Sequence, residues 1–480
     1  MSNADEFDLK KKQVEREGWA VLRLCEELGD HIQEGRSRKT YLIETEKFIN
    51  YIQDSINIIN IYVKDIIQKL REDSIDQELV QAKHRGLGQT KNVLGLLYML
   101  TKDVIDADSL SIPFSLSIFI NEKTKEIQGL KNASLVIFGT SDLNFYQRSL
   151  KKLRVLSLVL HEEIVDFPIF SSDISILHFP YSTAKQILVN CILFHEMGHF
   201  VYENTNMEPE FKQTVKRNLP IFLDSNPEIA RQTKFPLYIS KYVWHLLRKW
   251  VNEIFADIFA IRILGPAYHF AYLEMVQLIP TNIEERNRTF TNTHPADDYR
   301  FRIQGIWLKK GRWDKVLKEK VRYIFDNLEK CQEQTSMSVY KINCRSPIDD
   351  KNSQENLHSW MLEQFENMVK IIEGKIEEKL KLFEEPIKDF EENDEAVTAC
   401  LEHGIVPSSI YRTTQEQAIH SNPTTLLNSG YFFYLTGMKK LLEKVKINNN
   451  ISDIDTQLFY MKRLNQWLAK GIEDWQIMKK

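Results

Sequence analysis

His195, Glu196 and His199 form a His-Glu-x-x-His pattern inside an apolar segment. On a helix, residues four apart lie on one face, so the two imidazoles would point the same way. Two imidazoles so placed can hold two corners of the ligand tetrahedron around Zn²⁺. Glu196 lies beside them, where a carboxylate can take a proton from water that the metal activates. Because three ionisable groups are costly to bury among apolar side chains without a metal or partners, the pattern favours a zinc site over a chance match.

A second element, Trp250–Ala260, carries apolar residues at helical spacing. Glu253 and Asp257 are four apart on its other face. A catalytic zinc needs three protein ligands and an open position for water, and Glu253 is the predicted third ligand, with Glu203 and His245 as alternatives. Asp257 is predicted to accept a hydrogen bond from the far nitrogen of a ligand imidazole, which would fix the tautomer of that ring.

The two elements together resemble the gluzincin metallopeptidases, whose pattern is His-Glu-x-x-His, a gap, and Glu-x-x-x-Asp, often introduced by Asn, as Asn252 does here. His294-Pro295-x-x-x-x-Arg300 further resembles a segment of the M48-type branch, in which a His or Arg faces the oxyanion of peptide hydrolysis. The resemblance covers about residues 175–305 and implies a zinc peptidase with His294 or Arg300 as transition-state stabiliser. The M48-type segment often has a second Pro where this chain has Ala296, and the alternative interpretation is a helix start with Thr293 as its cap.

Two related families do not fit the residues. Metzincins need Gly and a third His at the positions of Tyr202 and Thr205. The chain also lacks the Gly-x-Met-Glu-Asn segment that grips a free N-terminus in M1-type aminopeptidases, which favours an endopeptidase.

Composition narrows the class of protein. The 480 residues suffice for two or three domains, and the hydrophobic fraction of 43% is that of a globular protein. A net charge of −4 gives no basic surplus for nucleic acid or an anionic membrane. No apolar run is long enough for a membrane span, and charged residues rather than a signal-peptide core follow Met1. The five cysteines form no Cys-x-x-Cys pair, so we expect reduced thiols in the cytoplasm.

The order of the expected elements indicates an α+β fold that is predominantly helical. Residues 1–105 read as helical, including an Ile-rich face between Phe48 and Val63, with a turn at Arg85–Gly88. A zincin-like core is expected at 106–310, a small mixed sheet with the active-site helices, and a helical region at 311–480. The expected strands, from their β-rich composition, are Ser111–Ile120, Ala133–Thr140, Arg154–Leu160 and Asp173–Phe179.

Local patterns place the site on these elements. The strand at Ile174–His178 is predicted either to bind the substrate backbone at a sheet edge or to be buried. A helix is expected from Ser182 or Thr183 to Glu203, and another from Lys241 to Leu264, ended by Gly265-Pro266. A long helix is expected at Ser353–Glu385, and loops are expected at Lys388–Glu395 and Ser408–Ser429.

The sequence thus predicts a cytoplasmic zinc endopeptidase acting on a protein or peptide substrate. Its helical flanks are expected to gate the site or recruit a regulatory protein partner, in a role such as stress or antiviral defence. The alternative is a helical regulatory or interaction protein with a structural or inactive zinc site. Glu196 argues against that alternative, because a structural site needs no base.

Overall fold

The computed structural model describes residues 3–38, 43–72, 75–106, 114–140, 144–170, 174–204, 208–232, 236–278, 288–333, 336–379, 386–407, 410–411, 418–419, 421–438 and 453–479. The fold is mostly helical with a small sheet, as predicted. The chain divides into two compact units. Unit 1 comprises Met1–Ile112 and Asn132–Ser182, and unit 2 comprises Pro113–Lys131 and Thr183–Lys480. This division passes through the predicted core at 106–310, so the predicted domain boundaries stay a prediction.

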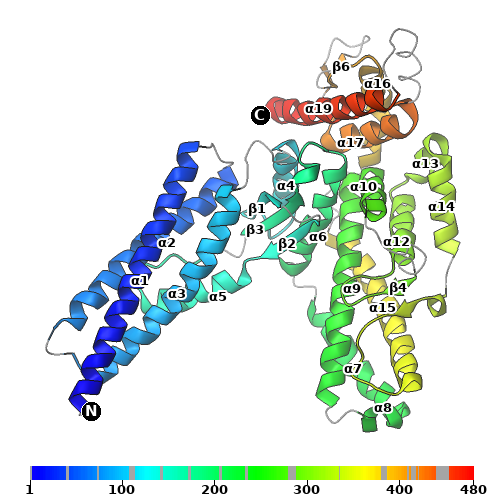
Figure 1. Ribbon diagram of the computed structural model, residues 1–480. Helices are drawn as coiled ribbons and strands as arrows, with labels where there is room; N and C mark the ends of the chain where they lie inside the picture. Colours follow the sequence, from blue (N-terminus) through cyan, green and yellow to red (C-terminus); the bar gives the residue numbers. More distant parts are fainter. Residues whose placement is uncertain are drawn as a thin grey trace. The chain divides into compact units, whose positions relative to one another are not determined.

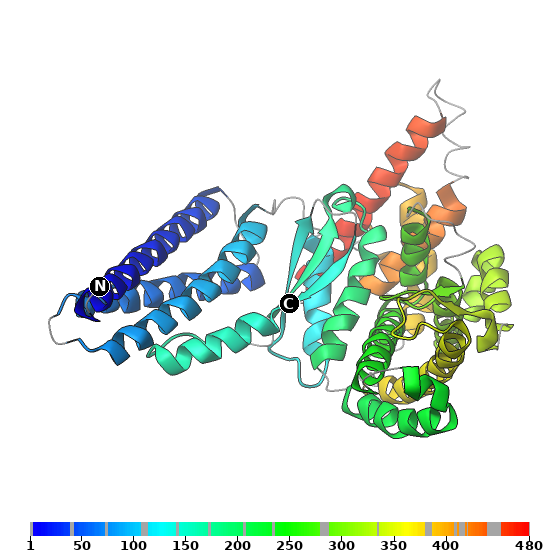
Figure 2. The same cartoon turned by 60° about the horizontal axis from the view of Figure 1, so that its bottom comes forward.

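Three long helices of unit 1 pack against one another: α1 (Asn3–Arg38), α2 (Ile43–Leu70) and α3 (Gln77–Asp106). Figures 1 and 2 show them side by side in blue. The predicted Ile-rich face of α2 is confirmed, because Phe48, Ile52, Ile59 and Val63 are fully buried. The turn predicted at Arg85–Gly88 is wrong, since these residues lie inside α3.

The sheet of unit 1 has the order β1-β3-β2. Strand β3 (Ile174–Pro180) pairs in parallel with β1 (Ser134–Thr140) and antiparallel with β2 (Tyr146–Ser149). The strands predicted at Ala133–Thr140 and Asp173–Phe179 are confirmed. The prediction that Ile174–His178 offers an edge to a substrate is wrong, because both edges of β3 are already paired and four of these five residues are buried. The alternative of a buried strand is confirmed.

Two other predicted strands are helices. Helix α4 (Phe114–Glu126) of unit 2 buries Ser115 and Ser117 as well as Leu116, so its alternating pattern does not separate an inner from an outer face. Helix α5 (Lys151–Glu163) of unit 1 buries Leu153, Ser157 and Leu160, which follow helical spacing.

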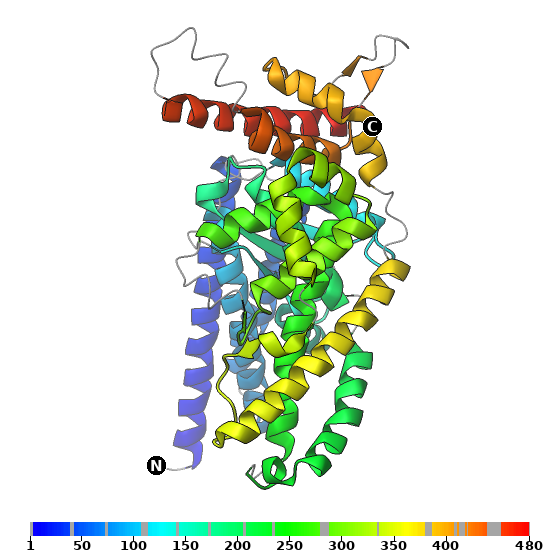
Figure 3. The ribbon, with the colours of Figure 1, turned by 90° about the vertical axis from the view of Figure 1, so that its right-hand side faces the viewer.

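Unit 2 is built around α9 (Pro236–Leu264), which contacts α6 (Leu193–Asn204), α7 (Glu208–Ser225), α10 (Pro266–Leu278), α12 (Asp297–Lys310), α15 (Lys351–Lys379), α16 (Pro386–Glu402) and α17 (Pro423–Phe432). Its other described elements are η3 (Val189–Ile192), α8 (Pro227–Gln232), β4 (Thr289–Phe290), α13 (Asp314–Lys320), α14 (Arg322–Glu333), η4 (Met337–Val339), β5 (Lys341–Ile342), β6 (Ile410–Tyr411), β7 (Ala418–Ile419), η5 (Phe433–Gly437) and α19 (Asp453–Lys479). The short helix η2 (Tyr181–Thr183) spans the residues at which unit 1 ends and unit 2 resumes. Figure 3 shows α17 (orange) alongside α19 (red).

The boundaries of the two predicted site helices, α6 and α9, agree only in part with the prediction. Helix α9 ends at Leu264 as predicted, because Gly265 has a positive φ of 60° that favours glycine. Helix α6 begins only at Leu193, so the start predicted at Ser182 or Thr183 is wrong. The hydroxyl of Thr183 instead donates a hydrogen bond to the side-chain oxygen of Asn190, at 2.9 Å between Oγ1 and Oδ1.

Two predictions for the C-terminal part are also wrong. The acidic segment predicted as a loop, Lys388–Glu395, lies in α16. The acidic run tolerates a helix because the carboxylate of Asp394 accepts a hydrogen bond from Ser429 and pairs with Lys320 at 2.7 Å. The end of the predicted irregular stretch Ser408–Ser429 lies in α17, whose first turn is capped by the Asn422 side chain, and residues 408–409, 412–417 and 420 of the stretch lie outside the described residues. The long helix expected at Ser353–Glu385 is present as α15, and residues 380–385 lie outside the described residues.

Candidate metal centre

Helices α6 and α9 approach each other closely at Gly198, which lies between the two motif histidines. A Cβ atom at this position would lie 2.7 Å from the Cα of Ala256 on α9. The absence of a side chain therefore lets the backbones of α6 and α9 come together. The contact sets His195 and His199 on α6 opposite Glu253 and Asp257 on α9.

The predicted ligands converge in unit 2. Nε2 of His195 lies 3.4 Å from Oε2 of Glu253, and Nε2 of His199 lies 3.5 Å from Oε1 of the same carboxylate. One ligand atom from each of the three residues falls within 4.8 Å of the others. Ligand atoms at the usual bond length from a tetrahedral zinc lie roughly 3.3 Å apart. The donor set and its spacing therefore fit such an ion.

Asp257 lies behind this cluster and is fully buried. Its Oδ1 lies 3.0 Å from Nδ1 of His195, on the side of the ring away from Glu253. Arg300, on α12, donates two hydrogen bonds to the carboxylate of Asp257, at 2.7 Å from Nε and 2.6 Å from Nη2. Tyr268, on α10, also donates a hydrogen bond to Asp257, and its hydroxyl lies 3.2 Å from Nδ1 of His195. Four elements of unit 2 thus meet at one carboxylate.

Charge pairing changes the acidity of these groups. Burial alone would lower the pKa of His195, but hydrogen bonds to Asp257 and Glu253 outweigh it and raise this pKa to about 9. Burial alone would raise the pKa of Glu253, but the neighbouring His199, His294 and Arg300 hold it well below its ordinary value. The carboxylates therefore remain ionised and able to balance a bound cation.

His294 and Arg300, both predicted as transition-state stabilisers, lie in different environments. The Arg300 side chain is only 4% exposed, and its guanidinium contacts Asp257, Glu253 at 3.2 Å and the ring of Tyr272 at 4.5 Å. The His294 side chain is 55% exposed, and its Nε2 lies 3.8 Å from Oε1 of Glu253. His294 can therefore meet a molecule from solvent, whereas the guanidinium of Arg300 is buried against Asp257 and Glu253.

Glu196 is 6% exposed and forms no hydrogen bond or ion pair with the residues that the structure describes. A nearly buried carboxylate without a partner is costly, and such groups concentrate at functional sites.

Neither of the alternative third ligands belongs to the cluster: Glu203 and His245 are absent from the group of ligand atoms within 4.8 Å. His245 is an exposed residue on α9.

Tyr268 is the site residue that the sequence did not reveal. A tyrosine in the apolar segment after Gly265 reads as a core residue, and no spacing links it to His195. Tyr268 contacts Asp257 and the ring of His195 only because α10 packs against α9 and α6 in the folded chain.

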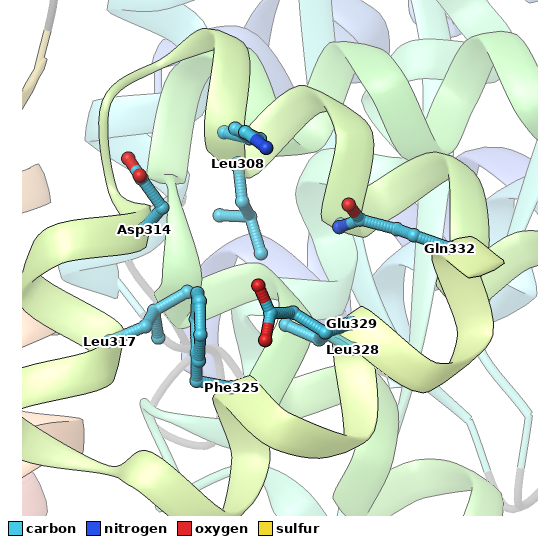
Figure 4. Close-up of a pocket in the computed structure, with 9 residues that line it drawn as sticks. Leu308, Asp314, Leu317, Phe325, Leu328, Glu329 and Gln332 are labelled. Atoms are coloured by element: carbon cyan, nitrogen blue, oxygen red, sulfur yellow. The ribbon is translucent and has the colours of Figure 1, made fainter.

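A separate small pocket lies between α12, α13 and α14 (Figure 4). Its wall includes Leu308, Leu317, Phe325 and Leu328. Its volume of about 50 Å³ is well below the several hundred Å³ typical of ligand sites. It contains none of the predicted site residues, and we assign it no function.

Comparisons with protein-family models, curated proteins and solved structures found no match to this chain. No helix in the described part of the chain is both long and apolar enough to cross a membrane.

Proposed function

We propose that this chain is a zinc-dependent peptidase, most simply an endopeptidase, that hydrolyses peptide bonds of a protein substrate. The observation that carries the proposal is the convergence of His195, His199 and Glu253 within 4.8 Å, from two helices. Two imidazoles and one carboxylate form a ligand set found in catalytic zinc sites. Structural zinc sites usually close all four positions with protein ligands.

Bound zinc would supply a Lewis acid that lowers the pKa of a coordinated water towards ~7. Glu196 follows His195 directly on α6, and its carboxylate forms no hydrogen bond or ion pair with the described residues. We assign Glu196 the role of general base, which takes a proton from the attacking water and delivers it to the leaving amine. Its carboxylate is suited to this role because no other described residue engages it.

We assign His294 the role of stabilising the oxyanion that develops on the substrate carbonyl. Its exposed imidazole lies beside the ligand Glu253 and can donate a hydrogen bond to a bound molecule. Arg300 is less suited to this role because its guanidinium is buried against Asp257 and Glu253.

The test combines zinc content with cleavage of casein by wild type and single variants. We expect wild type, Glu196→Gln and His294→Ala to bind one zinc per chain, and His195→Ala to bind none. Among these four proteins only wild type should cleave at full rate, with a loss of about 10²- to 10³-fold in His294→Ala. His245→Ala is the matched control, because it removes an exposed histidine from α9 that the centre does not use.

The outcomes separate the proposal from its alternative. Zinc binding with no cleavage of casein or of a broad peptide library would favour a structural or inactive site in a regulatory protein. Equal cleavage by wild type and Glu196→Gln would contradict the proposed mechanism.

A further inference from the structure

We infer that Tyr268 is a positioning residue that fixes the tautomer of His195 and so prepares its Nε2 for a metal ion. This inference rests on the proposed metal centre and deepens it. Three groups form a hydrogen-bonded chain that leads to Nδ1 of His195: the guanidinium of Arg300, the carboxylate of Asp257 and the hydroxyl of Tyr268.

The direction of each hydrogen bond follows from what each group can donate. A guanidinium can only donate, and Arg300 donates to both oxygens of Asp257. A carboxylate so paired is ionised and can only accept, so the single hydroxyl proton of Tyr268 is used on Asp257. The oxygen of Tyr268, 3.2 Å from Nδ1 of His195, is then left as an acceptor.

Both neighbours of the His195 Nδ1 atom are therefore acceptors: Oδ1 of Asp257 at 3.0 Å and the hydroxyl oxygen of Tyr268 at 3.2 Å. The proton of a neutral His195 must lie on Nδ1 to satisfy them. The lone pair then lies on Nε2, the atom that faces Glu253. Tyr268 and Asp257 together select the tautomer that a metal ligand needs.

Tyr268 acts on the ring from a buried position. The residue is fully buried, and its ring stacks parallel to that of His195, with 6.0 Å between the centroids. It has no exposed surface with which to touch a substrate, so its effect on chemistry must pass through His195 and Asp257. His199 has no corresponding support, because its buried Nδ1 makes no hydrogen bond with the described residues.

Tyr272 offers a matched control for Tyr268. It lies one turn further along α10, is 1% exposed, and its hydroxyl also donates to a buried carboxylate, that of Asp297, at 2.7 Å. Tyr268→Phe and Tyr272→Phe each remove one buried hydroxyl and keep the ring. A purely structural role would make the two variants alike in metal binding.

The experiment measures zinc affinity of the full chain by competition with a chromophoric chelator. We expect Tyr268→Phe to weaken zinc binding about 10- to 100-fold and to change the absorption spectrum of the Co²⁺-loaded protein. Tyr272→Phe should stay within about 3-fold of wild type.

The results distinguish this inference from the proposed function. If wild type binds zinc and the two Phe variants are equally affected or unaffected, the positioning role of Tyr268 is overturned while the metal centre stands. If wild type binds no zinc, the metal centre fails and this inference fails with it. If wild type binds zinc without cleaving any peptide, the peptidase proposal fails and the affinity comparison still decides the role of Tyr268.

Discussion

His294 and Arg300 belong to one short segment, yet their surroundings at the candidate centre differ. Arg300 binds the buried carboxylate of Asp257, whereas His294 is exposed beside Glu253. A sequence pattern identifies the residue types but not their partners, because partners are fixed by helix packing. The geometry favours a positioning role for Arg300, and the predicted contact of either residue with an oxyanion stays a prediction.

A buried histidine in unit 1 gives a pH prediction that is independent of the metal centre. His178 is 2% exposed, neither ring nitrogen makes a hydrogen bond with the described residues, and the ring stacks on Tyr146 at 4.2 Å. Burial, together with the nearby charge of Arg148, lowers its pKa from 6.5 to about 4. Between these values the unfolded chain binds more protons, so the stability due to neutral His178 is complete above pH 6.5 and is lost as pH falls towards 4.

The measurement is the free energy of unfolding of wild type and His178→Phe as a function of pH. We expect their difference to be constant above pH 6.5 and to shift by about 3 kcal/mol in favour of His178→Phe as pH falls to 4. The comparison cancels the titration of all other groups. A pH-independent difference would contradict the account of His178.

At the scale of elements, the two helices that carry the candidate ligands, α6 and α9, were predictable because the spacing of those residues is a local feature of the sequence. The spacing of His195 and His199 and that of Glu253 and Asp257 require a helix if the side chains are to act together. The strands predicted at Ser111–Ile120 and Arg154–Leu160 were wrong because short β-rich runs do not reveal how many sides of a segment are buried. Tertiary packing decided these cases.

The close contact of α6 and α9 predicts an unusual cost for adding a methyl group at Gly198. Replacing an exposed helical glycine with alanine usually stabilises a helix by about 0.5–1 kcal/mol. At Gly198 the new Cβ would lie 2.7 Å from the Ala256 backbone, so the helices must separate. We expect Gly198→Ala to lower the free energy of unfolding by about 1–3 kcal/mol and to weaken zinc binding.

Gly374→Ala provides the control for Gly198→Ala. Gly374 lies inside α15, is exposed, and has no atom within 4 Å of the position that a Cβ would take. Alanine there should be neutral or stabilising and leave zinc affinity unchanged. Stability and zinc affinity of Gly198→Ala equal to those of Gly374→Ala would show that α6 and α9 do not depend on this contact.

At the scale of the whole molecule, the C-terminal helices are part of the unit that holds the candidate centre. The side chain of Asn428 on α17 donates to the carbonyl of Leu264 at 2.7 Å and accepts from the backbone N–H of Ala267 at 2.8 Å, which joins the end of α9 to the start of α10. On α15, Phe365 packs against Trp250 of α9, with ring centroids 5.8 Å apart.

These contacts give the predicted C-terminal flank a structural role in unit 2. Helices α15, α16 and α17 pack against α9, the helix that carries Glu253, and so support the position of the candidate ligand. The sequence did not reveal this because contacts between residues so far apart in the chain leave no periodic signal. Regulation by the flanking helices or by a protein partner stays a prediction.

X-ray absorption at the zinc edge, on the full wild-type chain loaded with one equivalent of zinc, tests the central claim most directly. The account predicts a low-coordinate site of nitrogen and oxygen ligands at about 2.0–2.1 Å, with the scattering of two imidazoles, which is lost in His195→Ala. A sulfur ligand at about 2.3 Å, or a spectrum unchanged in His195→Ala, would contradict it.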